Sequence, residues 1–221
     1  MFRSKRRPII IPQSEHARFS GALACFWGNG DFARPNLPFD SFVKGVTLHD
    51  RGYGLFDTIP IGSVDEPRWL EVKRLSLEQR FDDEVANIVI AFHVLRLVGH
   101  TLTPPRKEFV KTHEQAVRER MKQVGVSAAE FEHADTITSF CDSVSYDFCF
   151  EQKKRGVVHV AGARGSRETV PISYELDENG SVTVSPWPFS VRSIESFVLG
   201  YDAHQYPARQ EPIVIQYSVH P

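Results

Sequence analysis

The pattern of hydrophobic and polar positions divides the chain into a helical part and a shorter part made of strands. Hydrophobic residues recur every three or four positions over 78–102, as on one face of an α-helix: Val85, Ile88, Val89, Phe92, Leu95 and Val98. Further helices are predicted over 14–27, 40–51, 106–124 and 127–150. Ser14 is a candidate cap, and Ser127 and Glu130 match a capping box. The prolines and glycine of 57–70 predict a loop.

After residue 150 the pattern changes to short runs rich in β-branched residues, which predict strands over 157–161, 170–176, 181–185 and 213–219. Asn179-Gly180 lies between two of these runs and predicts a hairpin. We therefore expect a mainly α protein. Residues 1–150 would form a helical domain, and residues 151–221 a small antiparallel β annex packed on it.

Composition narrows the class of protein. The 221 residues are 41% hydrophobic, and 26 Lys and Arg face 28 Asp and Glu. This near-neutral balance argues against general nucleic-acid binding, which needs a clustered positive field. No apolar run approaches the length of a membrane span, and the N-terminal residues lack the apolar core of a signal peptide. Three cysteines without a CxxC pair are typical of reduced thiols, so we expect a cytoplasmic protein.

The candidate chemistry lies in His49-Asp50, together with His16 on an earlier predicted helix and Asp142 on the last one. Imidazoles and carboxylates are ligands that divalent metals prefer, and helices packed together can project them towards one point. The spacing leaves other readings open. His16 could lie on the surface, His49-Asp50 could cap a helix end, and Asp135 competes with Asp142 on the same helix face.

These residues resemble known motifs. His16, His49-Asp50 and Asp142 resemble the H…HD…D signature of the HD-domain metal-dependent phosphohydrolases. The chain resembles more closely an uncharacterised bacterial family, a domain of unknown function, with a QxxHA…HDxGW…D pattern; Tyr53 stands where that family usually has Trp. The matching segments are Gln13–Ala17, Trp27-Gly28, His49–Tyr53, Phe92-His93, Phe140–Ser145 and Pro186–Phe189.

The resemblance implies an HD-like helical bundle that holds one or two divalent ions, which could be Fe, Mn, Zn or Mg. The implied metal ligands are His16, His49, Asp50 and Asp142. Asp50 would also orient the attacking water. His93 is a candidate catalytic or second-metal residue, with His113 as a further candidate for the second metal.

The implied activity is the hydrolysis of a small anionic substrate, a phosphoester or a nucleotide-like molecule, by metal-activated water. Arg51 is a candidate substrate-binding residue because guanidinium groups match phosphate oxygens, and Tyr53 is another. In the alternative readings Arg51 is a solvated cation at a helix end and Tyr53 packs over the core. Two other functions remain open: a metal- or ligand-binding module without turnover, and a non-haem iron oxygenase. The sequence also leaves a homo-oligomer open.

Overall fold

The structure is a computed structural model that describes residues 1–151, 153–162 and 168–221. Its helices are α1 (Gln13–Cys25), α2 (Phe39–Thr47), η1 (Arg51–Thr58), α3 (Glu66–Glu78), α4 (Glu84–Gly99), α5 (Pro104–Val124) and α6 (Ala128–Phe150). Its strands are β1 (Phe2–Arg3), β2 (Ile9–Ile11), β3 (Arg155–Ala161), β4 (Thr169–Leu176), β5 (Ser181–Ser185), β6 (Ile194–Asp202) and β7 (Ile213–His220).

The described strands form one seven-stranded sheet in the order β1-β2-β6-β7-β5-β4-β3. Most neighbouring strands are antiparallel, but β5 and β7 are parallel, so the sheet is mixed. The hairpin predicted at Asn179-Gly180 is confirmed. It joins the antiparallel strands β4 and β5, and Gly180 adopts a φ of 86° that favours glycine.

The prediction of a mainly α, HD-like bundle with a small antiparallel annex is wrong. A large mixed sheet covers one side of the helices, and strands from the N-terminus extend it by pairing β2 with β6. The strands β1 and β2 are too short to show a period of two. The burial of β6 does not alternate regularly along the strand, so its sequence pattern was also weak.

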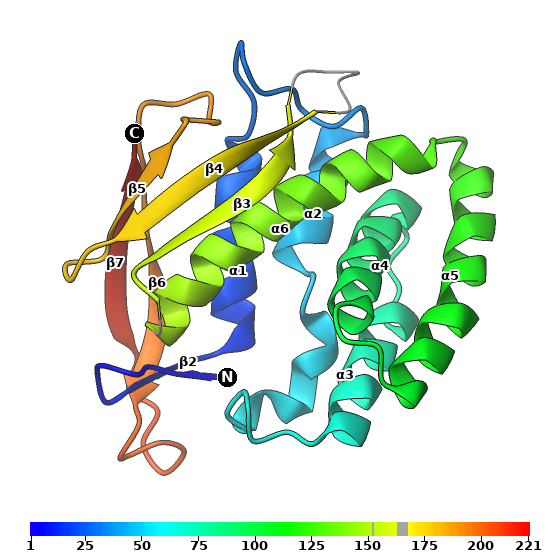
Figure 1. Ribbon diagram of the computed structural model, residues 1–221. Coiled ribbons are helices and arrows are strands. Elements are labelled where there is room, and N and C mark those ends of the chain that lie inside the picture. The colour runs from blue at the N-terminus through cyan, green and yellow to red at the C-terminus, as the bar shows by residue number, and fades with distance from the viewer. Residues whose placement is uncertain (152, 163–167) are drawn as a thin grey trace.

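The helices form layers behind the sheet (Figure 1). Helices α1 and α6 pack side by side and contact β6 and β3, whereas α2, α4 and α5 lie on the far side. Aromatic side chains join the first layer to the sheet. Phe19 of α1 stacks on Tyr217 of β7 with ring centroids 3.7 Å apart, and Trp27 pairs with Phe189 through an isolated β-bridge. Helices α1 and α6 are therefore held between the sheet and the remaining helices.

Side-chain caps explain why α5 and α6 begin close to their predicted positions. The hydroxyl of Thr103 accepts from the backbone N–H of Arg106 at the start of α5, and Ser127 does the same for Glu130 at the start of α6. The predicted capping role of Ser14 is wrong, because α1 begins at Gln13 without a side-chain cap.

Two boundaries that matter for the site were wrong. Helix α2 ends at Thr47, so His49 and Asp50 follow the helix instead of lying inside it. The loop predicted over 57–70 includes the start of α3, which Asp65 caps by accepting from the N–H of Arg68. Pro67 fits in the first turn because that turn needs no backbone donor there.

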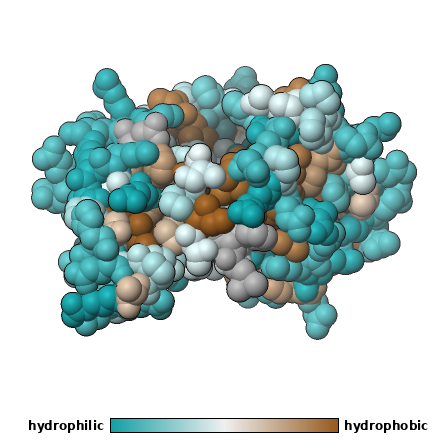
Figure 2. Space-filling model, turned by 90° about the horizontal axis from the view of Figure 1, so that it is seen from below, coloured by the Kyte–Doolittle hydropathy of each residue, from teal (hydrophilic) through white to brown (hydrophobic). Residues whose placement is uncertain are grey.

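The face seen from below is mainly hydrophilic, but hydrophobic residues gather near its middle (Figure 2). Among the described residues, every helix is too short or too polar to cross a membrane.

Candidate metal centre

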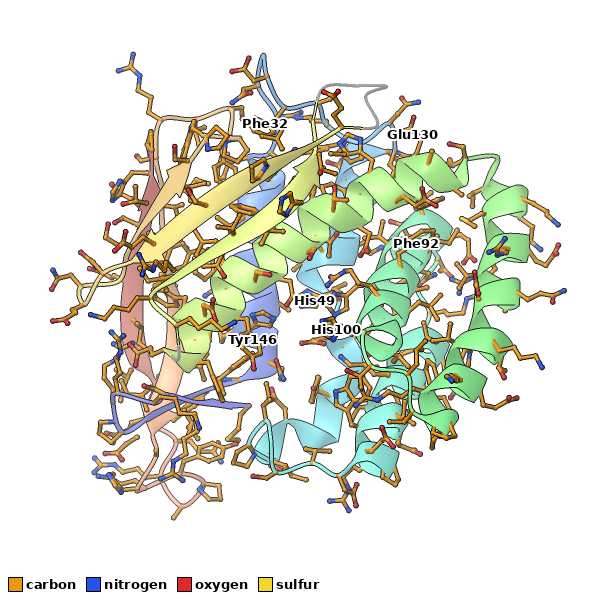
Figure 3. The ribbon with its side chains drawn as sticks, viewed as in Figure 1. Phe32, His49, Phe92, His100, Glu130 and Tyr146 are labelled. Carbon is orange, nitrogen blue, oxygen red and sulfur yellow. The ribbon has the colours of Figure 1, made fainter. Side chains whose placement is uncertain are left out.

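Three separate segments bring the predicted ligands together in the helical half of the molecule. His16 comes from α1, His49 and Asp50 from the turn after α2, and Asp142 from α6. Figure 3 shows His49 in the space enclosed by α1, α6 and α4. Both histidines are buried, and the side chain of Asp142 keeps 14% of its exposure. The ligand set is therefore largely buried, and Asp142 is its most exposed member.

The two imidazoles face each other through their Nε2 atoms, which lie 3.2 Å apart. Asp142 Oδ1 lies 3.1 Å from Nε2 of His16 and 3.6 Å from Nε2 of His49. Asp50 Oδ2 lies 3.8 and 3.7 Å from the same two nitrogens. One oxygen of each carboxylate thus lies within 3.8 Å of both facing imidazole nitrogens.

The outer nitrogens of the imidazoles determine where the lone pairs point. Nδ1 of His49 lies 2.7 Å from the carbonyl oxygen of Val46, which only accepts, so the hydrogen of the neutral ring is on Nδ1. Nδ1 of His16 lies 2.8 Å from Oγ of Ser145, whose own hydrogen can go to the carbonyl of Asp142. In this arrangement both Nε2 atoms direct lone pairs into the cluster, as metal-binding histidines do.

The charges of the cluster attract a cation. Burial opposes ionisation of Asp142, but the contacts with His16 and His49 hold the pKa of its carboxyl well below its usual range. Burial also works against a charged His49, yet the carboxylates of Asp50 and Asp142 raise its pKa. A proton or a metal ion between the facing nitrogens relieves their repulsion. The negative charge of the two carboxylates therefore favours both a proton and a metal ion at this position.

The distances fit a small divalent ion. Nitrogen and oxygen ligands of tetrahedral zinc lie about 2.0–2.2 Å from the ion, which separates neighbouring ligand atoms by about 3.3 Å. The separations of 3.2 Å between the imidazoles and 3.1 Å between His16 and Asp142 are close to this value. His16, His49 and Asp50 also meet the geometric requirement for a shared ion. The donor set of two imidazoles and two carboxylates suits such an ion.

A buried lysine holds the other oxygen of Asp50. Nζ of Lys73, on α3, donates to Oδ1 of Asp50 at 3.0 Å, and the lysine side chain is 1% exposed. The rings of Tyr53 and Trp69 lie 5.1 and 5.7 Å from Nζ. Burial alone would lower the pKa of Lys73, but Asp50 raises it; Lys73 in turn outweighs burial and keeps the pKa of Asp50 well below its usual range.

His93 lies beside this cluster and contacts an arginine. Its Nε2 is 3.8 Å from Asp50 Oδ1, and its Nδ1 is 3.8 Å from Asp142 Oδ2. Arg96, one turn further along α4, donates to Nδ1 of His93 at 3.0 Å and also binds Asp135 at 3.0 Å. Burial and the nearby His49 lower the pKa of His93 to about 3. Asp135 thus binds Arg96, whereas Asp142 contacts the histidines.

The other predicted residues have different surroundings. The guanidinium of Arg51 donates to the carbonyl of Ser76 and to Asn87 and lies 4.4 Å from the centre of the Phe81 ring, so it joins α3 to α4. Tyr53 packs beside Lys73, and burial raises its pKa to about 12. His113 lies on α5 against Phe109, and no described contact joins it to the ligands.

The sequence analysis missed Lys73, Arg96 and Ser145. The N-terminal signal of α3 at Asp65-Glu66-Pro67 could have placed Lys73 on a helix, but a lone lysine there is usually exposed. Arg96 interrupts an apolar stripe three residues after His93, which puts both on one helix face. Ser145 follows Asp142 by the same spacing.

Comparison with family models gives a match over most of the chain. Residues 1–205 match the model of a family described as protein of unknown function DUF3891. The chain belongs to this family. The comparisons find no match among curated proteins or among solved structures. The family description assigns no activity, so the chemistry has to be argued from the geometry of the site.

Proposed function

We propose that the protein is a metal-dependent hydrolase of small anionic phosphoesters. The observation that carries this proposal is the cluster of His16, His49 and Asp142, whose ligand atoms lie 3.1–3.6 Å apart. Two imidazole nitrogens that face each other at this distance beside two carboxylates form a set of donors suited to a cation. The ligand order along the chain, which resembles the HD-domain signature, gives separate support for the metal.

His16, His49, Asp50 and Asp142 would hold the ion. A divalent ion in such a site acts as a Lewis acid and lowers the pKa of bound water towards about 7. Ser145 and the carbonyl of Val46 keep the two imidazoles in the required tautomer and orientation. This support matters because the groups behind a ligand contribute to metal affinity.

The cations beside the ligands favour an anionic substrate. Lys73 contacts Asp50, and Arg96 reaches to within 3.7 Å of Asp142 Oδ2. Positive groups next to a metal stabilise the charge that develops on a transferring phosphoryl group. The exposed edge of Asp142 marks the side from which a substrate would approach.

The reaction would proceed by attack of water on phosphorus. The water oxygen forms a new P–O bond, and the bond between phosphorus and the ester oxygen breaks. Asp50 would orient the water, and the proton that the water loses would pass to the departing alkoxide. His93 faces this region with an unpaired Nε2 and would donate a hydrogen bond to a phosphoryl oxygen.

Metal content tests the site first. We expect His49→Gln and Asp142→Asn to lose most of the bound Mn²⁺ while the circular dichroism spectrum stays unchanged. His113→Gln is the matched control, since His113 packs on Phe109 away from the ligands. Full occupancy in the folded His49→Gln and Asp142→Asn variants would overturn the metal centre.

Activity is tested with a panel of phosphomonoesters and phosphodiesters, with Mn²⁺, Fe²⁺, Mg²⁺ and Zn²⁺ supplied in turn. The proposal expects phosphate or alcohol release that disappears in both ligand variants and persists in His113→Gln. Silence across the panel with the ion retained would overturn the hydrolase in favour of a binding module. Oxygen uptake after anaerobic loading with Fe²⁺ would overturn it in favour of an oxygenase.

A further inference from the structure

We infer that the centre holds a single metal ion, because the side chains of Lys73 and Arg96 occupy the places from which a second ion would be bound. The inference rests on the proposed metal site. The residues that a second ion would need are Asp50, through its second oxygen, and His93. Each of them is already in contact with a cationic side chain.

The two carboxylate oxygens of Asp50 have different partners. Its Oδ2 faces the Nε2 atoms of His16 and His49, whereas its Oδ1 accepts from Nζ of Lys73 at 3.0 Å. To bridge two ions, Asp50 would have to exchange this ammonium for a metal. Lys73 is buried on α3 between Asp50 and the rings of Tyr53 and Trp69, so an ion at Oδ1 would face an ammonium that burial holds in place.

Arg96 determines the tautomer of His93. A guanidinium only donates, so Nδ1 of His93 must accept, and the hydrogen of the ring is on Nε2. That Nε2 is buried and has no hydrogen-bond partner among the described residues. A nitrogen that carries a hydrogen cannot bind a metal ion. His93 therefore presents a hydrogen-bond donor, not a ligand, to the region beside Asp50.

The charge balance leads to the same conclusion. The carboxylates of Asp50, Asp135 and Asp142 together contact two cations, Lys73 and Arg96. This leaves one negative charge, which a single divalent ion already overcompensates. A second ion would add two more positive charges to a mostly buried cluster, where unbalanced charge is costly.

The arrangement assigns the task of a second ion to protein side chains. In a two-metal site the second cation neutralises a substrate oxygen and positions it for in-line attack. Here Lys73 supplies an ammonium at Asp50, His93 an unpaired Nε2–H beside Asp50, and Arg96 a guanidinium beside Asp142. They are the positioning groups for the phosphoryl oxygens.

The number of ions can be measured on the unmodified full chain. Metal-free protein is titrated with Mn²⁺, and the bound ions are counted by calorimetry and native mass spectrometry. We expect one ion per chain and the electron paramagnetic resonance signal of an isolated Mn²⁺ at saturation. Two ions with an exchange-coupled signal would overturn the single-ion centre while leaving the metal site intact. No bound ion would overturn the metal site itself.

Variants test whether Lys73 and Arg96 exclude a second ion. In the double variant Lys73→Met with Arg96→Met, Asp50 Oδ1 and His93 become free, and we expect a second, weaker Mn²⁺ with a coupled signal. Lys73→Arg keeps the charge and should keep one ion. Arg120→Met removes a partly buried cation that binds Glu84 and not one of the proposed ligands. This variant should also keep one ion. A folded double variant that still takes one ion would overturn the role of the two cations.

Discussion

The Nε2 atoms of His16 and His49 lie 3.2 Å apart; the ring hydrogen of neutral His49 points away to the carbonyl of Val46, and that of His16 can point away to Oγ of Ser145. Two lone pairs at this separation repel each other, and the surrounding carboxylates cannot supply a hydrogen. The protein tolerates the arrangement because α1 and the turn after α2 are held by the packing of α1 on α2 and α6. The cluster is thus organised before a cation enters, which lowers the cost of binding one.

The orientation of His16 depends on Ser145, one turn after Asp142 on α6. We expect Ser145→Ala to weaken Mn²⁺ binding by about 10- to 100-fold, because the ring loses the group that holds its tautomer. Calorimetric titration measures the change. Thr138→Val is the matched control, since Thr138 is buried on the same helix and its hydroxyl donates to the carbonyl of Ala134, away from the ligands. Equal losses in both variants would contradict a specific role of Ser145.

Asp147 provides a prediction about pH. Its carboxylate accepts from the hydroxyl of Tyr174 at 2.6 Å, and burial raises the pKa of Asp147 above its usual value. The folded state therefore binds this proton more tightly than the unfolded state. It follows that the free energy of unfolding falls as pH rises from about 4 through the folded-state pKa, and that it stays reduced at neutral pH.

The variant Asp147→Asn keeps an acceptor for Tyr174 but has no proton to lose. We expect it to be more stable than the parent at pH 7, with the difference shrinking at pH 3.5, where both states of the parent are protonated. Urea unfolding at the two pH values measures this. A difference that is the same at both pH values would show that the carboxyl of Asp147 does not titrate as expected.

Gly52 gives the close approach between the turn after Asp50 and α3. A Cβ atom at this position would overlap the carbonyl oxygen of Val72 and the hydroxyl of Ser76. We expect Gly52→Ala to lower the free energy of unfolding by about 1–3 kcal/mol through overpacking. It should also weaken metal binding, because displaced α3 carries Lys73 away from Asp50.

Gly99→Ala is the control for this substitution. Gly99 ends α4, and a Cβ there meets no atom within 4 Å. We expect it to be neutral or to stabilise the protein by up to about 1 kcal/mol, since alanine favours helix. Urea unfolding and Mn²⁺ titration compare the two. The same effect from both glycines would contradict the packing argument.

Local sequence signals predicted some of the fold and missed the rest. The cap at Ser127 and the turn at Gly180 lie where short-range chemistry acts within four residues. The strands β1, β2 and β6 exist because they pair with partners far away in the chain. Such pairing leaves no clear periodic pattern when a strand has two or three residues or irregular burial.

The sequence by itself determined the candidate ligands, because the order of His16, His49, Asp50 and Asp142 resembles a known pattern of ligand types, and it left Asp135 open beside Asp142. Only the tertiary structure decided what surrounds them. Lys73 and Arg96 belong to residue types that are usually solvated, and nothing nearby in the chain marks them as buried. Long-range packing of α3 and α4 brings their charges to the carboxylates, and coulombic contact at about 3 Å makes them part of the site.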